Sequence, residues 1–372
     1  MEPPASSVIL DCGSGMTKAG KGGETMPRSV FPTLVGTPKS TGGMPAMGRK
    51  NIYIGDEAIA KKGVLKLTYP VNNGNIKDWE DMKAIWLHSF FNEMREEPKE
   101  SAVFITDPDK DPKINKEKIA QIFFEEFKVP AIYMTNPGIL SLYASGLTTG
   151  VAVDCGDCLT LCVPGHEGMA DSKAMSKKYF GGRILTNYLV QLLNERENIF
   201  QTGGEQYNVK SIKEKACFVA LDSDNVSKEG LDHLYTLPDG SQITLSNERY
   251  MACEALFKPE LAVGKVEEGL HTFIMNSINK SDESLHSSLL SNVVLAGGTT
   301  LFPGLKERLE KELSALAPEG MAVSVKAPEG REYSAWLGGS LMATLSTFKC
   351  MWLSQADYKE NGSAIIGSKF PV

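Results

Sequence analysis

Two short stretches of the sequence carry residues that could bind a phosphate together with a metal ion. Val8–Lys18 reads VILDCGSGMTK and Val151–Leu161 reads VAVDCGDCLTL, so Asp11 and Asp154 hold the same place in each. Each stretch predicts a hairpin: a buried strand, a tight turn in which glycine supplies a positive φ, and a returning strand. Such a turn directs several backbone N–H groups to one side, and the resulting concavity binds anions, of which phosphate is the natural occupant.

The two carboxylates predict a cation beside that phosphate. Asp11 and Asp154 would repel a phosphate that they touched, so we expect Mg²⁺ between them, because Mg²⁺ is typically held through carboxylates and substrate phosphates and keeps most of its water. Lys18 supplies the remaining positive charge. A single Asp-x-Gly turn is more often a plain β-turn. Two copies indicate two similar half-molecules that clamp the phosphates of one nucleotide from opposite sides of a cleft.

Other segments supply the elements that must hold this site. Val293–Leu309 predicts a strand, a glycine turn and a helix that begins near Pro303, and its adjacent glycines allow close approach to a ligand such as adenosine. An ordinary strand-to-helix turn is the alternative. Further segments have helical periodicity, and several large apolar residues are expected in the core. The segments are Asp78–Met94, Lys113–Phe127, Tyr179–Leu193 and Val209–Asp222, and the core residues are Trp79, Ile85, Trp86, Ile122, Trp336 and Trp352.

Composition argues against several classes of function. The chain has 372 residues and a formal charge of −7, with no run of basic residues that could neutralise a row of phosphates, so nucleic acid is not expected as a partner. No apolar run approaches the ~20 residues that cross a bilayer, and the start MEPPASS lacks the features of a signal peptide. We therefore expect a cytosolic protein without a membrane partner. Seven cysteines, an odd number in a long chain, favour reduced thiols over a disulfide framework.

Three of these cysteines have a spacing superficially like that of a metal or redox site. Cys155, Cys158 and Cys162 lie close to His166 in the sequence. A zinc site needs a second ligand pair on another turn, and a redox Cys-x-x-Cys motif opens a helix after a strand, whereas this segment reads strand, turn, strand. Structural thiols are therefore the favoured interpretation, and metal or redox chemistry is the alternative.

The chain resembles the actin family nearly from end to end. The motifs that carry the resemblance are DCGSGMTKAG, PRSVFPTLVG, YIGDEAIAKKGVLKLTYPV, SLYASGLTTG, DCGDCLT, IKEKACFVALD, LPDG with SNERY, AGGTTLFPGL and YSAWLGGSLMATLSTFKCMW. The resemblance implies an α/β, actin-like ATPase fold: two similar α/β domains, each a copy of a ribonuclease H-like motif, around a central nucleotide cleft. It also implies that ATP or ADP binds there with Mg²⁺ or Ca²⁺.

The resemblance assigns residues to this nucleotide site. One group in the first stretch and an opposing group in the second would contact the phosphates, while Asp11 and Asp154 would hold the water shell of the cation. The phosphate contacts are Gly13, Ser14, Gly15, Met16 and Lys18, opposed by Gly156, Asp157, Cys158 and Leu159. The adenosine contacts are Gly182, Lys210, Lys213, Glu214, Gly298, Thr299, Leu301 and Phe302.

Several positions depart from the family pattern. Lys210 stands where actins have arginine, Phe302 where they have tyrosine, and Glu332 where they have a lysine beside the adenine. Pro137 and Leu161 replace the glutamine and histidine that position the attacking water in actins, and neither side chain can hydrogen-bond to water. Because phosphoryl transfer depends on positioning and electrostatics, we assign no catalytic residue and expect slow or absent ATP hydrolysis. The alternative is that another side chain or a chain of waters orients the attacking water.

Surface positions leave three classes of function open. Ser40–Asn51 matches the loop that actins insert into the next subunit. The groove that receives partners in actins stays apolar, with Tyr143, Met342 and Leu345. Loop and groove favour a cytoplasmic, cytoskeletal filament protein whose partners are itself, other actin-family subunits or actin-binding proteins. The altered hydrolysis positions favour instead an actin-related subunit of a multiprotein complex, with ATP as a structural ligand. A sugar kinase of the wider superfamily is the least favoured class, because a shared fold does not carry function.

The resemblance also divides each domain into a large and a small subdomain. In the first domain, the large subdomain comprises residues 1–32, 70–144 and 334–372, and the small subdomain comprises 33–69 with the polymer-contact loop 40–51. In the second domain, the large subdomain comprises 145–180 and 266–333, and the small subdomain comprises 181–265.

Overall fold

The computed structural model of the chain describes residues 6–39, 51–108, 113–196, 200, 203–227 and 230–370. Its contacts divide the chain into two units. Unit 1 comprises Met1–Thr148, Glu167–Ser172 and Tyr333–Val372, and unit 2 comprises Thr149–His166 and Lys173–Glu332. The chain thus passes from one unit to the other after Thr148, His166, Ser172 and Glu332. The finer division into four subdomains stays a prediction.

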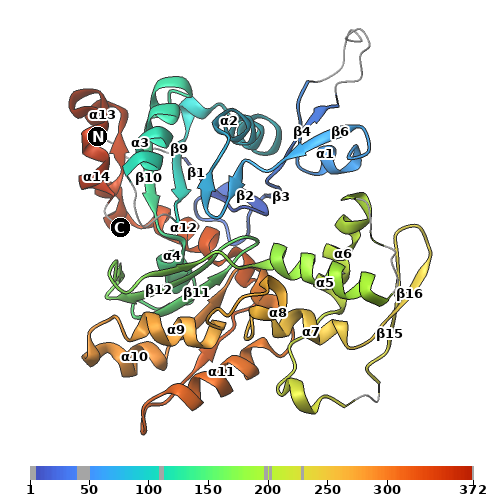
Figure 1. Cartoon of the computed structure of the whole chain (residues 1–372). Helices are drawn as coiled ribbons and strands as arrows, with labels where there is room; N and C mark the ends of the chain where they lie inside the picture. The colour runs from blue at the N-terminus through green and yellow to red at the C-terminus, as the bar shows by residue number, and fades with distance from the viewer. Residues whose placement is uncertain are drawn as a thin grey trace. The chain divides into compact units, whose positions relative to one another are not determined.

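Unit 1 contains a large mixed sheet and a smaller sheet (Figure 1). The strands of the large sheet are, in spatial order, β19 (Leu353–Ser354), β10 (Ala131–Thr135), β9 (Ala102–Thr106), β1 (Ser7–Cys12), β2 (Met16–Lys21) and β3 (Ser29–Pro32). The strands of the smaller sheet are β5 (Tyr53–Ile54), β4 (Val35–Pro38) and β6 (Leu65–Thr68). Strand β1 runs parallel to β9 and antiparallel to β2. A predicted hairpin therefore forms the centre of the large sheet.

Two helices of unit 1 that flank the sheet begin at capping side chains. Asp78 accepts hydrogen bonds from the N–H groups of Glu80 and Asp81, and Asn136 accepts one from Gly138. The predicted helices over 78–94 and 113–127 are confirmed, and each ends in a π-helical turn, Ser89–Met94 and Ile122–Glu126. The remaining elements of unit 1 are α1 (Asp56–Ala60), α2 (Trp79–His88), α3 (Lys113–Gln121), α4 (Pro137–Ala144), α12 (Ser334–Thr344), α13 (Gln355–Asn361), α14 (Ile365–Lys369), β7 (Val71–Asn72), β8 (Asn75–Ile76) and β13 (Met169–Ala170).

The core of unit 1 is rich in aromatic side chains. Trp86 and Trp336 are fully buried, and the indole N–H of Trp336 donates to the carbonyl of Ile9 over 3.1 Å. The predicted core residues Ile85, Ile122 and Trp352 are also buried, whereas Trp79 is only partly buried and packs against the edge of the core. Helix α12 therefore lies on the central strand of the sheet through a hydrogen-bonded tryptophan.

Unit 2 contains a second mixed sheet and a separate hairpin (Figure 1). Its strands pair in the order β14 (Ser176–Lys178), β12 (Thr160–His166), β11 (Gly150–Cys155), β17 (Val293–Ala296) and β18 (Val325–Lys326), and the hairpin is β15 (His233–Thr236) with β16 (Gln242–Leu245). The helices of unit 2 are α5 (Gly182–Arg196), α6 (Gly203–Ala216), α7 (Glu248–Glu254), α8 (Glu260–Val263), α9 (Leu270–Ile278), α10 (His286–Leu290) and α11 (Leu305–Leu316). Helices α9, α10 and α11 pack against β12, β11 and β18.

The two sheets have the same topology. In unit 1 the order β3, β2, β1, β9, β10 combines two antiparallel pairs with two parallel pairs. In unit 2 the order β14, β12, β11, β17, β18 repeats the same pairings. The predicted duplication of one α/β motif is therefore confirmed.

One predicted helix of unit 2 ends earlier than expected. The periodicity of Val209–Asp222 predicts a helix through residue 222, but α6 ends at Ala216. The N–H of Phe218 donates to the carbonyl of Arg249, and that of Val219 donates to the carbonyl of Pro303 over 2.8 Å. These bonds to distant segments replace the bonds that would continue the helix.

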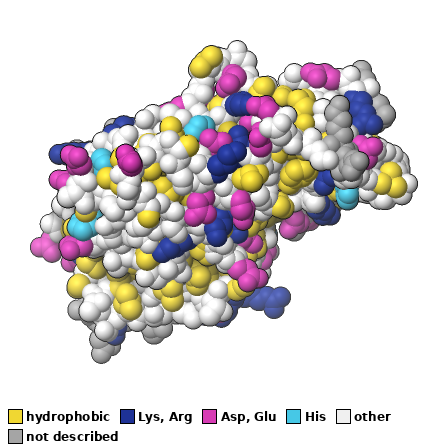
Figure 2. Space-filling model, turned by 90° about the horizontal axis from the view of Figure 1, so that it is seen from below, with side chains coloured by type: hydrophobic (Ala, Val, Ile, Leu, Met, Phe, Trp, Pro, Cys, Tyr) yellow, Lys and Arg dark blue, Asp and Glu magenta, His cyan; other side chains and the backbone are white. Residues whose placement is uncertain are grey.

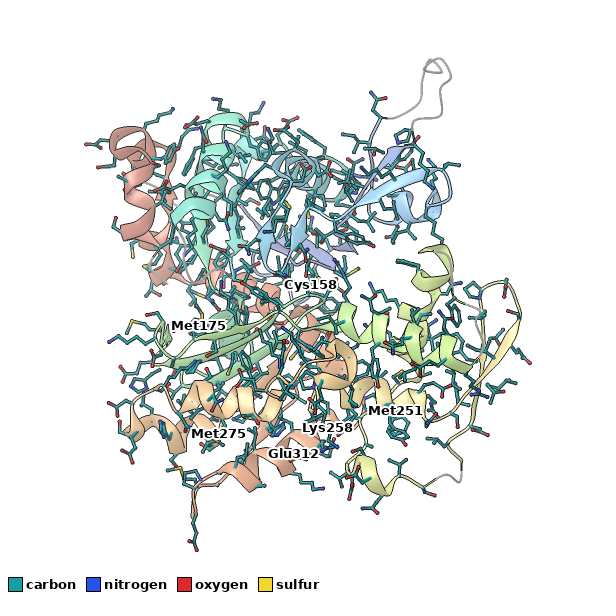
Figure 3. All side chains as sticks on the ribbon, in the orientation of Figure 1. Cys158, Met175, Met251, Lys258, Met275 and Glu312 are labelled. Atoms are coloured by element: carbon teal, nitrogen blue, oxygen red, sulfur yellow. The ribbon has the colours of Figure 1, made fainter. Side chains whose placement is uncertain are left out.

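A buried ion-pair cluster joins the helices of unit 2. Arg308 donates to both carboxylate oxygens of Glu254, over 3.1 and 3.2 Å, and to Glu312 over 2.6 Å. Its guanidinium also lies 4.6 Å from the ring centroid of Phe257. Lys258 and Glu312 form the rim of this cluster (Figure 3). Because both buried charges are paired and hydrogen-bonded, the cluster fixes α11 against α7.

The surface of the described chain is mixed in charge. On the face that Figure 2 shows, Lys and Arg side chains are interspersed with Asp and Glu side chains. Among the described helices, none combines the length and the apolar character that a bilayer span requires.

Candidate functional site

The turn between β1 and β2 forms a compact loop that we call the first clasp, residues Gly13–Met16. The N–H of Gly13 donates to the carbonyl of Met16 over 3.0 Å and closes the turn. Thr33 ties this loop to the start of the smaller sheet: its N–H donates to Gly15, and its hydroxyl lies 2.8 Å from that of Thr17. Ser14 is buried. The clasp is therefore a rigid, hydrogen-bonded turn.

Asp11 lies beside the first clasp and is neutralised within unit 1. Lys18, its cross-strand neighbour, donates to one carboxylate oxygen over 2.8 Å. The hydroxyl of Thr106 donates to the other oxygen over 2.7 Å. Each carboxylate oxygen has two lone pairs, so a metal-bound water can still be accommodated. The structure thus brings Asp11 and Lys18 together as an ion pair, and Thr106 is an added partner.

The turn between β11 and β12 forms the second clasp, residues Gly156–Leu159. The N–H of Gly156 donates to the carbonyl of Leu159 over 2.8 Å, which is the same closing bond as in the first clasp. Cys158 and Leu159 are buried (Cys158 is labelled in Figure 3). Each unit therefore carries the same turn at the equivalent place in its own sheet.

The expectation that glycine supplies a positive φ in these turns is wrong. Gly13, Gly15 and Gly156 do not have positive φ. A Cβ on Gly13 would instead lie 3.2 Å from the carbonyl oxygen of Met16, and a Cβ on Gly156 would lie 3.2 Å from that of Leu159. Gly13 and Gly156 are favoured because a Cβ at either position would crowd the carbonyl oxygen that accepts the closing hydrogen bond.

The second clasp rests on the start of helix α5. The N–H groups of Gly182 and Arg183 donate to the carbonyls of Gly156 and Asp157 over 3.0 and 2.8 Å. The guanidinium of Arg183 also forms an ion pair of 2.6 Å with the carboxylate of Asp157. Thr299 donates its hydroxyl to the carbonyl of Gly156 over 2.8 Å. Two segments far apart in the sequence therefore fix the same turn.

Lys213 joins this group from helix α6. Its ammonium is buried and donates to the carbonyl of Gly182 over 2.7 Å. Burial lowers the pKa of Lys213, and the nearby carboxylates of Glu214 and Asp157 oppose this shift. The structure thus brings three predicted adenosine contacts, Gly182, Lys213 and Thr299, against the second clasp.

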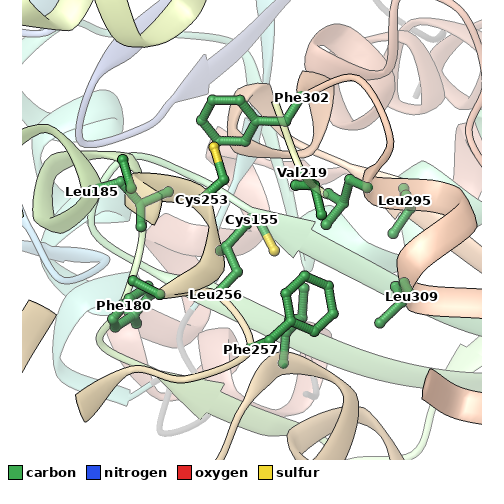
Figure 4. Packing of buried hydrophobic residues seen from close by; sticks show 14 of the residues in the cluster. Cys155, Phe180, Leu185, Val219, Cys253, Leu256, Phe257, Leu295, Phe302 and Leu309 are labelled. Atoms are coloured by element: carbon green, nitrogen blue, oxygen red, sulfur yellow. The ribbon is translucent and has the colours of Figure 1, made fainter. Parts of the chain in front are cut away.

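The other predicted adenosine contacts lie in different surroundings. Lys210 is partly buried, Glu214 and Leu301 are exposed, and a Cβ added to Gly298 would face open space. Phe302 is buried in the core of unit 2, where it faces the sulfur of Cys253 (Figure 4).

A glycine that sequence analysis passed over is the one that the backbone requires. Gly297 has φ of +84°, and a Cβ there would lie 2.3 Å from a carboxylate oxygen of Asp154 and 2.5 Å from the carbonyl of Cys155. Its N–H donates to the carbonyl of Arg331 over 3.0 Å. Only glycine permits β17 to turn so closely over Asp154.

A comparison with protein families agrees with this duplicated architecture. The family model described as Actin matches residues 2–371. The chain belongs to the actin family. Its mixed α/β fold with two equivalent sheets is therefore the actin-like fold that the resemblance implies.

Thr106, Arg183 and Gly297 support the clasps in this actin-family chain but were not predicted as site residues. A threonine at a strand end and an arginine at a helix start have no distinctive local pattern. In the sequence, only the adjacent glycines of the AGG motif indicate a close approach of the backbone, and the resemblance assigns the ligand contact to Gly298.

The two positions linked to slow hydrolysis have clear structural roles. Pro137 occupies the first turn of α4, directly after the cap residue Asn136, where proline costs no hydrogen bond. Leu161 is the cross-strand neighbour of Asp154 and is only 2% exposed. By register Leu161 is the unit 2 counterpart of Lys18. An apolar residue thus stands where unit 1 has a cation.

The predicted partner groove falls on described residues, whereas most of the predicted loop does not. Tyr143 lies on α4 and donates its hydroxyl to the carbonyl of Gly168 over 3.0 Å. Met342 on α12 is partly buried, and Leu345 is 52% exposed. Loop residues 40–50 lie outside the described residues.

The cysteines of the second hairpin have the expected strand, turn, strand context. Burial raises the pKa of Cys155 and of Cys162 to about 12. Burial, and secondarily the charge of Asp11, raises the pKa of Cys12 to about 12. In the part of the chain that the structure describes, His, Cys, Asp and Glu side chains form no group of three or more that could hold a metal ion.

We expect Cys350 to be the fast-reacting thiol of the native protein at pH 8. It is exposed, whereas the other cysteines are buried or partly buried, and a thiol with a pKa of about 12 is almost entirely protonated at that pH. Titration with an aromatic disulfide reagent should give one fast equivalent, which Cys350→Ser removes and Cys162→Ala preserves. Two or more fast equivalents in the natural protein would contradict this expectation.

Proposed function

We propose that this actin-family chain binds ATP or ADP together with Mg²⁺ or Ca²⁺. The observation that carries the proposal is the repetition of one clasp in both units, with the same closing hydrogen bond and an aspartate at the same register. A duplicated anion-binding turn next to a carboxylate suits a metal-bound polyphosphate. The joint grip of both clasps on one nucleotide stays a prediction from the sequence.

The clasp residues suit the two ends of such a ligand differently. The backbone of both clasps, the hydroxyl of Ser14 and the ammonium of Lys18 would bind phosphate oxygens. Asp11 and Asp154 would hold the cation through water, and the cation would neutralise part of the phosphate charge. Lys213, Gly182 and Thr299 already lie against the second clasp, so we assign the sugar and base to their side of unit 2.

Hydrolysis by this chain is proposed to be slow or absent. In-line attack on a phosphate needs an oriented water, and neither Pro137 nor Leu161 has a side chain that can hydrogen-bond to one. Both residues are also buried in regular secondary structure. Small movements of the backbone at these positions therefore cannot supply the hydrogen-bonding group that would orient the water. The nucleotide would then act mainly as a ligand that stabilises the fold.

The cellular role that suits these features is that of a filament-forming or filament-associated cytoskeletal protein in the cytoplasm. The exposed Leu345 and the partly buried Tyr143 and Met342 offer apolar surface for actin-family subunits or actin-binding proteins. The second candidate is a subunit of a multiprotein complex that keeps ATP as a structural ligand. The replaced hydrolysis positions favour this second role.

Nucleotide binding can be tested with Lys18→Met. Loss of the ammonium leaves Asp11 without its cross-strand cation, so ATP with Mg²⁺ should bind about tenfold or more weakly than to the natural protein. Isothermal calorimetry measures the change. Lys21→Met is the matched control, because Lys21 lies on the same strand but pairs with Glu96. Equal affinities for the two variants, or no binding to the natural protein, would refute the proposal.

Slow hydrolysis can be tested by restoring the water-positioning groups. Under single-turnover conditions the natural protein should release phosphate far more slowly than conventional actin in the same assembly state. Combining Pro137→Gln with Leu161→His should raise its rate by about tenfold or more. Leu161→Met controls for repacking, and thermal melting checks that each variant folds. Equal release from the natural protein and actin would contradict the expectation.

Sedimentation separates the two cellular roles. If the chain forms filaments, protein incubated with ATP and Mg²⁺ should pellet only above a threshold concentration, and Leu345→Asp should raise that threshold. The control is Lys306→Asp, which changes an exposed residue on α11 in unit 2. Persistent monomer at all concentrations would instead support the subunit role.

A further inference from the structure

We propose that the groove between α3 and α13 in unit 1 binds an acidic peptide segment of a partner protein, in which carboxylates flank apolar side chains. The groove shares no residue with the proposed nucleotide site or with the predicted partner groove at Tyr143, Met342 and Leu345. The inference rests on the shape of the groove, on its aromatic floor and on lysines that have no carboxylate partner.

The groove has the size and shape of a site for an elongated ligand. Its volume is about 1010 Å³, and its two walls are helices that Figure 1 labels. On each wall the lining side chains recur three, four or seven residues apart, so they share one face of the helix over about two turns. They include Lys118, Gln121 and Glu125 on the first wall and Gln355, Tyr358 and Lys359 on the second. A cleft of this kind between helices suits a peptide segment.

Aromatic side chains form the floor of the groove. Phe124 and Tyr358 are buried and stacked, with ring centroids 4.7 Å apart, and the partly buried Trp79 lies beside the same cavity. Burial, and then the hydrogen bond of 3.1 Å to Glu125, raise the pKa of Tyr358 to about 12, so its hydroxyl stays a donor at neutral pH. The floor therefore offers apolar contact area to leucine or aromatic side chains of a ligand.

The backbone beside this floor departs from regular helix. Phe124 and Glu125 belong to the π-helical turn Ile122–Glu126, and turns of this type are rare and frequent at functional sites. Lys128, which also lines the groove, has φ of +60°, a conformation that is uncommon for lysine. Both departures adjoin one cavity, which supports a binding role for it.

Three lysines of the groove have no carboxylate partner. Lys118 donates to the side-chain oxygen of Gln121 over 3.1 Å, and Lys359 donates to that of Gln355 over 3.1 Å. Lys128 is exposed. Among the described residues, none of these three lysines forms an ion pair with a carboxylate. Their positive charges therefore remain for a ligand.

The carboxylates of the groove do not cancel these charges. The groove contains two of them, Glu117 and Glu125, against three lysines. One oxygen of Glu125 accepts from Tyr358 over 3.1 Å, and the other accepts from Gln121 over 3.3 Å, so this carboxylate is already satisfied. Because ammonium groups at the rim attract carboxylates and repel basic side chains, the complementary segment is acidic, with apolar side chains that reach the aromatic floor.

The first experiment selects phage-displayed random short peptides that bind the purified full chain. A counter-selection removes the peptides that also bind a variant without the three charges, which combines Lys118→Gln, Lys128→Asn and Lys359→Gln. Asparagine is chosen at position 128 because it tolerates a left-handed backbone. The peptides that remain should be rich in aspartate and glutamate next to leucine or aromatic residues.

The second experiment measures the affinity of the most enriched peptide by fluorescence anisotropy. Exposed ion pairs each contribute little, so loss of three lysines should weaken binding by about fivefold to tenfold, and added salt should weaken binding to the natural protein. The matched control combines Lys66→Gln, Lys99→Gln and Lys349→Gln, which removes three exposed lysines of unit 1 outside the groove and should leave the affinity within about twofold. Thermal melting checks that both variants fold.

The results decide the proposal without reference to nucleotide binding. Acidic peptides that distinguish the groove variant from the control variant support it. Selection of no discriminating peptide, or only of neutral or basic ones, overturns it. Sedimentation velocity of the natural chain alone gives a further outcome: a dimer that the groove variant abolishes would assign the groove to a second copy and also overturn the proposal.

Discussion

The structure depends on how a carboxylate is accommodated at the end of a buried strand. In unit 1, Asp11 satisfies both of its oxygens through Lys18 and Thr106, which lie on the two strands next to β1. Pairing and hydrogen bonds of this kind offset the cost of burying a charge. The adjacent turn is thereby fixed in the conformation that suits phosphate.

Unit 2 repeats the frame with different residues beside the aspartate. By register, the counterparts of Lys18 and Thr106 are Leu161 and Ala296, which are apolar. The duplicated fold therefore presents one aspartate with a built-in cation and one whose cross-strand neighbours carry no charge. The shared topology therefore holds two aspartates at the same register in different chemical surroundings.

The support of the second clasp comes from segments that are distant in the sequence. The start of α5, the hydroxyl of Thr299 and the ammonium of Lys213 meet within a few ångströms of Gly182. Substitutions in such a frame can change chemistry without changing the fold. Leu161 puts an apolar side chain on the strand next to Asp154, while the sheet that carries both keeps its order.

The sequence by itself determined the features that local patterns encode: both hairpins, the helices over 78–94 and 113–127, the buried tryptophans Trp86 and Trp336, and the actin-family architecture. It could not determine features that depend on distant partners. The end of α6 at Ala216 is set by carbonyls of other segments, and the glycines of the clasps are needed for space, not for positive φ. Likewise, the contacts of Thr106 with Asp11 and of Phe124 with Tyr358 emerge only in the folded structure. The physical reason is that propensity and periodicity act between near neighbours in the chain, whereas hydrogen-bond satisfaction in a folded core is decided by whichever groups the tertiary structure brings together.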